Sequence, residues 1–206
     1  MALVKYNNNS LSAITAASSL PTGAMTLIKE QTASSSSTIS FVDGTSDVVL
    51  DSTYPIYLFK FINIHPSADS AQFMVGFRDG GSAYDATKTT TFFKAYHAED
   101  DAGNAFTYEA SDDMAQGTGV TFLSSNVDND NDAQLCGELY LFAPSSTTFV
   151  KHFMYRGVVL GATKYCYNDF VAGYANVTAA IDGVQFTYDD GNMDVGTIKL
   201  YGIKDS

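Results

Sequence analysis

The chain has 206 residues, of which 45% are hydrophobic, 13% aromatic and only 17% charged, a composition that suits one β-sandwich with a core of its own. Its 23 carboxylates outnumber its 11 Lys and Arg residues, so the net charge is −12 and no basic run is available to bind phosphates. This balance excludes nucleic acid and anionic lipid as partners. No stretch approaches the ~18 consecutive apolar residues of a membrane span, so membrane insertion is not expected.

The N-terminal residues differ in composition from the rest of the chain. Residues 1–20 are small and polar with spaced apolar side chains, which fits either a disordered tail or an arm that orders against a partner. A strand is predicted at 25–31, followed by a Ser/Ala-rich hinge. We divide the chain into an arm and connector, 1–35, and a body, 36–206. The side chains expected to dock on a partner are Leu3, Val4, Tyr6, Leu11, Ile14 and Leu20.

The body alternates short apolar runs with loops rich in Gly, Asn, Asp and Pro. No helical period is sustained for three turns, although residues 98–119 leave room for a single helical turn. The pattern predicts an all-β fold, an antiparallel β-sandwich of jelly-roll type or otherwise a barrel, preceded by the extended N-terminal arm. The strands predicted in the body are 38–42, 54–64, 71–78, 89–97, 120–123, 136–142, 149–155, 165–175, 184–188 and 196–203.

The segment 149–155 illustrates the alternation and its one flaw. Phe149, Phe153 and Tyr155 fall on one face of a strand with a side-chain period of two. Lys151 interrupts that aromatic face.

No catalytic motif is present. The sequence has no G-x-S-x-G, H-E-x-x-H or P-loop pattern. Its histidines, His65, His97 and His152, are far apart and none has a His or Cys at metal-ligand spacing. They are interpreted as surface or strand histidines, and the protein is not expected to be an enzyme.

An acidic run is the most suggestive local feature. Asp128, Asp130 and Asp132 imitate positions one, three and five of an EF-hand loop. The sixth position, which requires Gly, is Ala133, and the twelfth, which requires Glu, is Leu139. The run is therefore either a solvated loop, since turns select Asn and Asp, or a looser Ca²⁺ site. No other cofactor is expected.

Glycoside hydrolysis and sugar binding are two further candidate functions. Hydrolysis of a glycoside needs two facing carboxylates, and Glu138 and Asp169 are the acids in or beside strands. Most other acids lie in loops of like charge, and Trp is absent, which argues against a glycosidase. The thirteen tyrosines suit a sugar-binding surface or, more commonly, a core edge or subunit interface.

The two cysteines, Cys136 and Cys166, both lie in strand-like segments. One disulfide between them and two reduced thiols are the alternatives, and reduced thiols are favoured because a free Cys behaves as a small core residue.

Several segments of the body resemble a domain common in tailed bacteriophages, especially phages of marine bacteria and cyanobacteria. The resemblance covers residues 36–203 and is most specific in 147–153 together with the ending Gly-Thr-Ile-Lys-Leu-Tyr-Gly at 196–202. The segments that carry it are 36–41, 57–66, 91–97, 144–153, 171–174 and 191–202.

The resemblance implies a virion structural protein, assembled in the cytoplasm of an infected bacterium and without catalytic residues. We expect the body to project from the particle while the arm docks on the major capsid protein or on tail subunits. Homo-oligomers, with a trimer as the expected form, suit such assembly. A head decoration or cement protein is favoured because the chain has no heptad or repeat shaft. The alternative is a tail fibre or tail-tip protein that recognises carbohydrate on the host surface.

Overall fold

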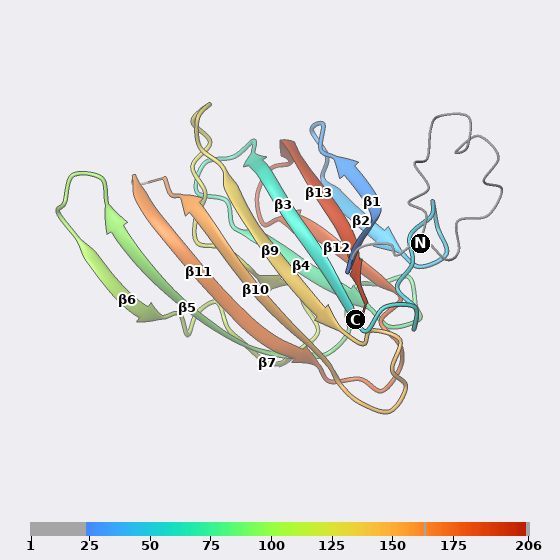
Figure 1. Cartoon of the computed structure of the whole chain (residues 1–206). Helices are drawn as coiled ribbons and strands as arrows, with labels where there is room; N and C mark the ends of the chain where they lie inside the picture. The colour runs from blue at the N-terminus through green and yellow to red at the C-terminus, as the bar shows by residue number, and fades with distance from the viewer. Residues whose placement is uncertain (1–23, 163, 205–206) are drawn as a thin grey trace, which may run out of the picture.

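A computed structural model describes residues 24–162 and 164–204 of the chain, and these residues form two antiparallel β-sheets packed face to face. Figure 1 shows the larger sheet toward the viewer and the smaller one, with β2, β12 and β4, behind it. The described residues contain no helix. The strands are β1 (Met25–Thr32), β2 (Thr38–Val42), β3 (Ile56–Pro66), β4 (Phe73–Arg78), β5 (Lys88–Ala98), β6 (Asn104–Tyr108), β7 (Met114–Gly117), β8 (Thr121–Phe122), β9 (Leu135–Phe142), β10 (Lys151–Leu160), β11 (Tyr165–Ala175), β12 (Gly183–Tyr188) and β13 (Met193–Ile203).

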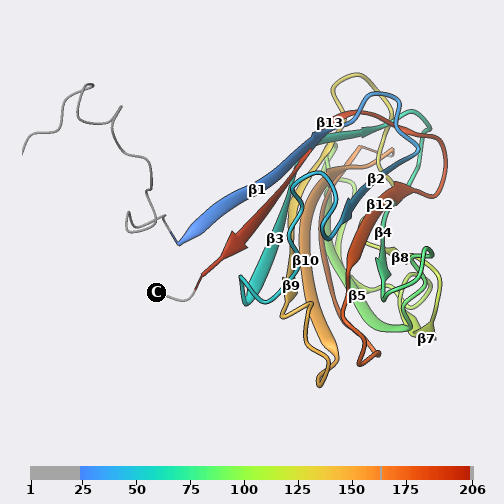
Figure 2. The same ribbon diagram turned by 90° about the vertical axis from the view of Figure 1, so that its right-hand side faces the viewer.

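The two sheets differ in size. The large sheet has nine strands in the order β1-β13-β3-β9-β10-β11-β5-β6, with β7 also paired to β5. The small sheet has four strands in the order β2-β12-β4-β8. Seen from the side, the two sheets are separate layers, and β1 and β13 run together along one edge of the large sheet (Figure 2). The predicted antiparallel sandwich is therefore confirmed, while the jelly-roll connectivity stays a prediction.

Aromatic side chains from both sheets fill the space between the layers. Phe61 of β3 lies 5.2 Å from Phe73 of β4 and 5.0 Å from Phe186 of β12, measured between ring centroids, and all three are almost fully buried. Such edge-to-face pairs contribute about 0.5–1.5 kcal/mol each beyond the area they bury. Because strands alternate their side chains, each strand of the large sheet has an inner face toward this core and an outer face away from it.

The strand predicted at residues 25–31 belongs to the large sheet. β1 pairs with β13 from Met25, opposite Ile203, to Thr32, opposite Thr197. This part of the segment 1–35 is thus an edge strand. The six docking side chains predicted between Leu3 and Leu20 lie outside the described residues.

Residues 98–119 do not contain the single helical turn for which the sequence leaves room. They include two short strands instead, β6 and β7, which both pair with β5 at the far edge of the large sheet. As an edge strand, β6 pairs with one neighbouring strand only, and its Phe106 and Tyr108 side chains remain exposed. Its sequence therefore shows only weakly the alternation of buried apolar residues by which strands are predicted.

The predicted strand at 149–155 begins two residues later than expected. β10 starts at Lys151, and Phe149 lies in the preceding loop with 73% of its surface exposed. Lys151 does occupy the inner face, fully buried, because its Nζ donates hydrogen bonds to the carbonyl oxygens of Val177, at 3.0 Å, and Ala179. The lysine that interrupts the aromatic face is therefore solvated by backbone.

Candidate functional site

Two of the three acids in the predicted calcium loop bind a lysine. Lys164 Nζ donates to Asp128 Oδ2 at 2.5 Å and to Asp130 Oδ2 at 2.6 Å. Burial opposes ionisation of Asp128, but hydrogen bonds from Lys164 and from the loop backbone outweigh it and lower the pKa of that carboxyl. Asp132 is exposed and lines a separate cleft beside Cys136. The ammonium group thus occupies the place where these carboxylates would hold a cation.

The described residues contain no group of three or more His, Cys, Asp or Glu side chains placed to hold a metal ion. The histidines are scattered. His65 contacts the carbonyl oxygen of Asp130 at 3.1 Å, His97 pairs with the exposed Asp101 at 3.1 Å, and the ring centroid of His152 lies 5.9 Å from that of Tyr174. None of these contacts brings a histidine to a nucleophile, which is the pairing that nucleophilic catalysis needs.

The two acids considered for glycoside hydrolysis lie on opposite faces of the large sheet. Asp169 of β11 pairs with Gly157 on the inner face and is fully buried. Glu138 of β9 pairs with Arg156, the neighbour of Gly157, on the outer face. Since adjacent residues of a strand point to opposite sides, these two carboxylates cannot flank one glycosidic bond.

The two cysteines are free thiols, as the sequence favours. Cys136 pairs with Val158 and Cys166 pairs with Leu160, so strand β10 lies between them. Strands two positions apart are separated by roughly 9–10 Å, which exceeds the ~7 Å between Cα atoms that a disulfide can bridge.

Asp169 is buried behind a polar cleft that the sequence did not predict, and it holds Ser125, one of the residues that line this cleft. Its carboxylate accepts hydrogen bonds from the backbone N–H of Ser125, at 2.7 Å, and from the Ser125 hydroxyl, at 2.8 Å. Burial raises the pKa of Asp169 to about 6, although both hydrogen bonds favour the ionised form. Lys94 of β5 is its cross-strand neighbour.

A cleft of about 360 Å³ opens beside Ser125 and is walled mainly by polar side chains. Lys94 Nζ lies 3.3 Å from Glu109 Oε1 on one side of it. On another side the Gln72 amide donates to Asp112 Oδ2 at 3.1 Å and to the carbonyl oxygen of Ser124 at 3.1 Å. The cleft therefore presents both hydrogen-bond donors and acceptors, each held in place by a neighbour.

Three tyrosines stand beside this cleft on the inner side of β5 and β11. The ring centroids of Tyr96 and Tyr165 are 5.2 Å apart, and those of Tyr96 and Tyr167 are 5.7 Å apart. All three side chains are half-buried, and Tyr167 also lines the cleft. Lys94 Nζ lies 5.2 Å from the centre of the Tyr167 ring. The cleft and the tyrosine cluster thus form one continuous surface.

The outer face of the large sheet carries a second unusual surface, which we call the outer row. Phe93 stacks on Phe170 with ring centroids 5.0 Å apart and lies 5.4 Å from Phe106, while the Arg156 guanidinium lies 5.4 Å from the centre of the Phe170 ring. The outer row crosses eight strands in register, from Tyr108 through Phe93, Phe170, Arg156, Glu138, Lys60 and Lys199 to Glu30.

The outer row is nearly neutral in a strongly acidic protein. Its three cations and two anions leave a net charge of +1, against −12 for the whole chain. Of the 22 carboxylates among the described residues, four lie in strands and 18 lie in the segments between them. Exposed apolar side chains flank the row, among them Met154, Val158 and Phe106, at 56%, 48% and 72% exposure.

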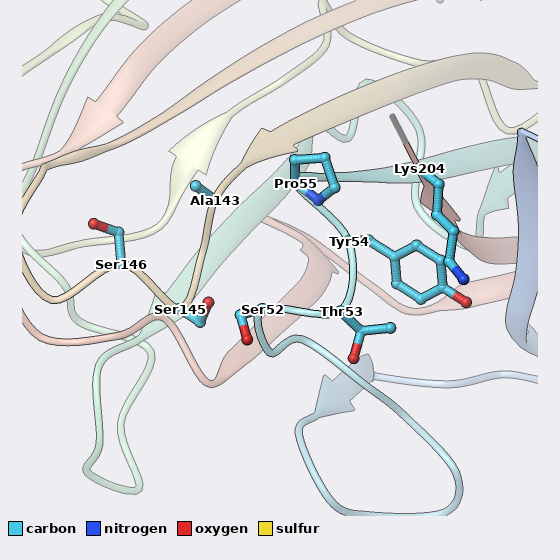
Figure 3. A pocket seen from close by; sticks show the side chains of 8 residues that line it. All are labelled: Ser52, Thr53, Tyr54, Pro55, Ala143, Ser145, Ser146 and Lys204. Carbon is cyan, nitrogen blue, oxygen red and sulfur yellow. The ribbon is translucent and has the colours of Figure 1, made fainter. Parts of the chain in front are cut away.

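A further opening, of about 470 Å³, lies near the end of β13 (Figure 3). Figure 3 shows Lys204 alongside Tyr54, whose ring centre is 5.7 Å from Lys204 Nζ, and the hydroxyl-bearing Ser52, Thr53 and Ser145 nearby. Asp51 lies beside this opening and accepts a hydrogen bond from the backbone N–H of Thr53 at 2.7 Å.

No protein-family model, curated protein or solved structure matches this chain. Among residues 24–162 and 164–204, no helix is long and apolar enough to cross a membrane.

Most of the polar cleft could not be predicted from the sequence. Gln72, Lys94, Glu109 and Ser125 come from separate parts of the chain, and only Lys94 lies in a strand, so the four meet only through the packing of the two sheets and their loops. One signal was present, because Asp169 is the only carboxylate in the otherwise apolar and aromatic stretch 165–175. The outer row could not be predicted from the sequence, because its residues become neighbours only through the register of seven strand pairs.

Proposed function

We propose that the chain is a non-enzymatic structural protein of a tailed-phage virion. It is displayed on the particle surface as a head decoration or cement protein and is anchored through the N-terminal segment 1–35. Two observations support this role: the resemblance of residues 36–203 to a domain of tailed phages, and the exposed, nearly neutral outer face of the large sheet.

The structural support for this proposal is the exposed outer face of the large sheet. A soluble protein seldom leaves a wide, aromatic sheet face uncovered, and such faces commonly mark contacts between proteins. Each 100 Å² of apolar area removed from water contributes about 2.5 kcal/mol before the costs of association. The acidic loops repel other copies of the chain, while the outer row presents no excess of negative charge. Assembly through this face therefore avoids the repulsion felt elsewhere on the surface.

The position of β1 fits the proposed anchoring. β1 forms the edge of the large sheet, with Met25 and Leu27 about half exposed on the outer side. The predicted docking side chains, between Leu3 and Leu20, precede this strand in the sequence. In the particle, the partners are major capsid or tail subunits and further copies of the chain, assembled as trimers.

Cryo-electron microscopy of virions from a phage that carries this gene tests the role directly. We expect regular copies over the capsid lattice, and a deletion of residues 1–20 should leave a folded protein that no longer enters particles. Met154→Glu, on the outer face, should also reduce incorporation, whereas Thr178→Glu in an exposed loop should not. Absence of the protein from purified virions, or normal incorporation of the deletion, would refute the proposal.

The alternative role is a tail fibre or tail-tip protein that binds carbohydrate on the host surface. The observation that favours it is the polar cleft beside the tyrosine cluster. Density confined to the tail in the same images would support this alternative.

A further inference from the structure

We propose that the cleft between Gln72, Lys94, Glu109 and Tyr167 binds an uncharged saccharide. This site lies on the inner side of β5 and β11, whereas the proposed assembly surface is the outer face of the same sheet. The inference deepens the carbohydrate-binding role given above as the alternative, and because the site faces away from the assembly surface it does not depend on where in a particle the protein is placed.

The size and enclosure of the cleft suit a small ligand. Its volume of about 360 Å³ falls at the lower end of the 300–1,000 Å³ typical of small-molecule sites. It is also more enclosed than the openings beside Lys204 or over the outer face. A ligand of one or two sugar rings would be surrounded on several sides.

The charges that line the cleft point to an uncharged ligand. Lys94 is the one cation among the described residues that line it, and its charge is already balanced by Glu109 at 3.3 Å. Asp112 adds a second carboxylate, which repels phosphates and carboxylates. A metal ion is also disfavoured, because the Lys94 ammonium stands next to Glu109. An uncharged molecule avoids both penalties.

The hydrogen-bonding groups point to hydroxyls. Glu109 and Asp112 can only accept hydrogen bonds when ionised, Lys94 can only donate, and Gln72 can do both. A sugar hydroxyl donates one hydrogen bond and accepts others, so a row of hydroxyls can satisfy this mixture. A purely apolar ligand would leave these groups desolvated without partners, at a cost of about 1–3 kcal/mol for each.

The tyrosine cluster supplies the apolar part of the site. Aromatic rings pack against the C–H face of a sugar ring in the way they pack against other apolar groups. Tyr167 lies in the cleft, and Tyr96 and Tyr165 extend the aromatic surface beyond it. A longer saccharide would therefore pass from the cleft onto the two outer tyrosines.

The polar side chains are held in position without a ligand. Glu109 accepts a hydrogen bond from the Thr107 hydroxyl at 2.7 Å in addition to its pairing with Lys94. The floor of the cleft is fixed by Ser125, which donates twice to the buried Asp169. Such preorganisation lowers the entropy lost on binding.

Saturation-transfer NMR on the full-length protein tests the site. The probes are glucose, galactose, mannose, N-acetylglucosamine and their disaccharides, with glucose 6-phosphate and glucuronic acid as charged comparisons. We expect at least one neutral saccharide to receive saturation from the protein and the charged probes to receive less. The proposal would be overturned if no neutral saccharide received saturation from the protein, or if the charged probes bound more strongly.

Variants locate the binding within the molecule. Glu109→Gln preserves the shape of the side chain, and Tyr167→Ala removes the ring that lines the cleft. Each should weaken binding of the responding saccharide by about tenfold or more, the equivalent of about 1.4 kcal/mol. Tyr174→Ala, a tyrosine on the outer face, is the matched control and should bind normally. Circular dichroism verifies the fold, and unchanged binding in a folded Glu109→Gln would place the ligand elsewhere and refute the site.

Discussion

Asp169 and Ser125 form a sealed hydrogen-bonded pair inside the sandwich. Ser125 donates both its backbone N–H and its hydroxyl to the Asp169 carboxylate, which has no exposed surface. Burial is the larger influence and raises the pKa of Asp169 to about 6. The pair thus holds a carboxyl group whose charge costs stability near neutral pH.

Asp169→Asn should stabilise the protein at neutral pH. In the folded state the carboxyl has a pKa of about 6, against about 3.9 in the unfolded chain, so its stabilising protonation is complete below pH 4 and lost as the pH rises through 6. Asparagine keeps an acceptor for the Ser125 N–H without the charge. We expect a gain on the order of 1–3 kcal/mol at pH 7, and none at pH 4, in urea unfolding. The exposed Asp132→Asn serves as control, and a loss of stability at pH 7 would contradict this account.

Tyr155→Phe should also stabilise the protein. The Tyr155 hydroxyl is buried and, among the described residues, has no hydrogen-bond partner. Its ring lies over Gly157, where any Cβ atom would overlap the hydroxyl oxygen. Removing an unsatisfied hydroxyl relieves its desolvation, so unfolding should become less favourable by on the order of 1 kcal/mol. Reduced stability in the phenylalanine variant would mean that the hydroxyl has a partner.

Lys88→Met should raise stability at neutral pH and change its dependence on pH. Lys88 is fully buried, and burial lowers the pKa of its ammonium group to about 8. Because the unfolded pKa is about 10.4, the folded state loses its proton first, and the natural protein should gain stability as the pH rises from 8 to 10. Methionine should abolish this rise and add on the order of 1–3 kcal/mol at pH 7, offset in part by the lost hydrogen bond to Ala86.

The exposed Lys204→Met is the matched control for that experiment. It should leave both the stability at pH 7 and the slope between pH 8 and 10 unchanged. An equal slope in the natural protein and in Lys88→Met would show that another group titrates there.

Lys164→Met should create a response to calcium that the natural protein lacks. Lys164 forms ion pairs with both Asp128 and Asp130 and so takes the place of a cation. A chelator should therefore not change the melting temperature of the natural protein. Without Lys164, the nearly buried Asp128 loses its main partner, and the melting temperature should fall by several degrees. Added Ca²⁺ should restore part of that loss. A chelator effect on the natural protein would instead establish a bound metal in this loop.

The thiols should behave independently of each other. Cys136 and Cys166 are separated by strand β10, so a reducing agent should leave the melting temperature unchanged. Both should react with a thiol reagent in the folded protein, Cys166 faster because it is more exposed. If neither thiol reacted until the protein had been reduced, the two cysteines would instead form a disulfide.

Local pattern was sufficient to find most of the strands. The predicted limits 38–42 and 165–175 coincide with β2 and β11, because alternation of apolar and polar residues is a property of neighbouring residues along the chain. The same property predicted an antiparallel sandwich. It failed at β6 and β7, since edge strands bury one side only and need little apolar sequence.

Which strands pair, and in which register, was decided only by the tertiary structure. A shift of one residue would move Asp169 from the buried face to the exposed one and Glu138 the other way. The binding of Lys164 to Asp128, 36 residues earlier, and of Lys94 to Glu109 likewise depends on turns that bring distant residues together. The sequence by itself therefore determined most of the strands and the class of fold. The cleft and the outer row arise from contacts across strands, which no local pattern encodes.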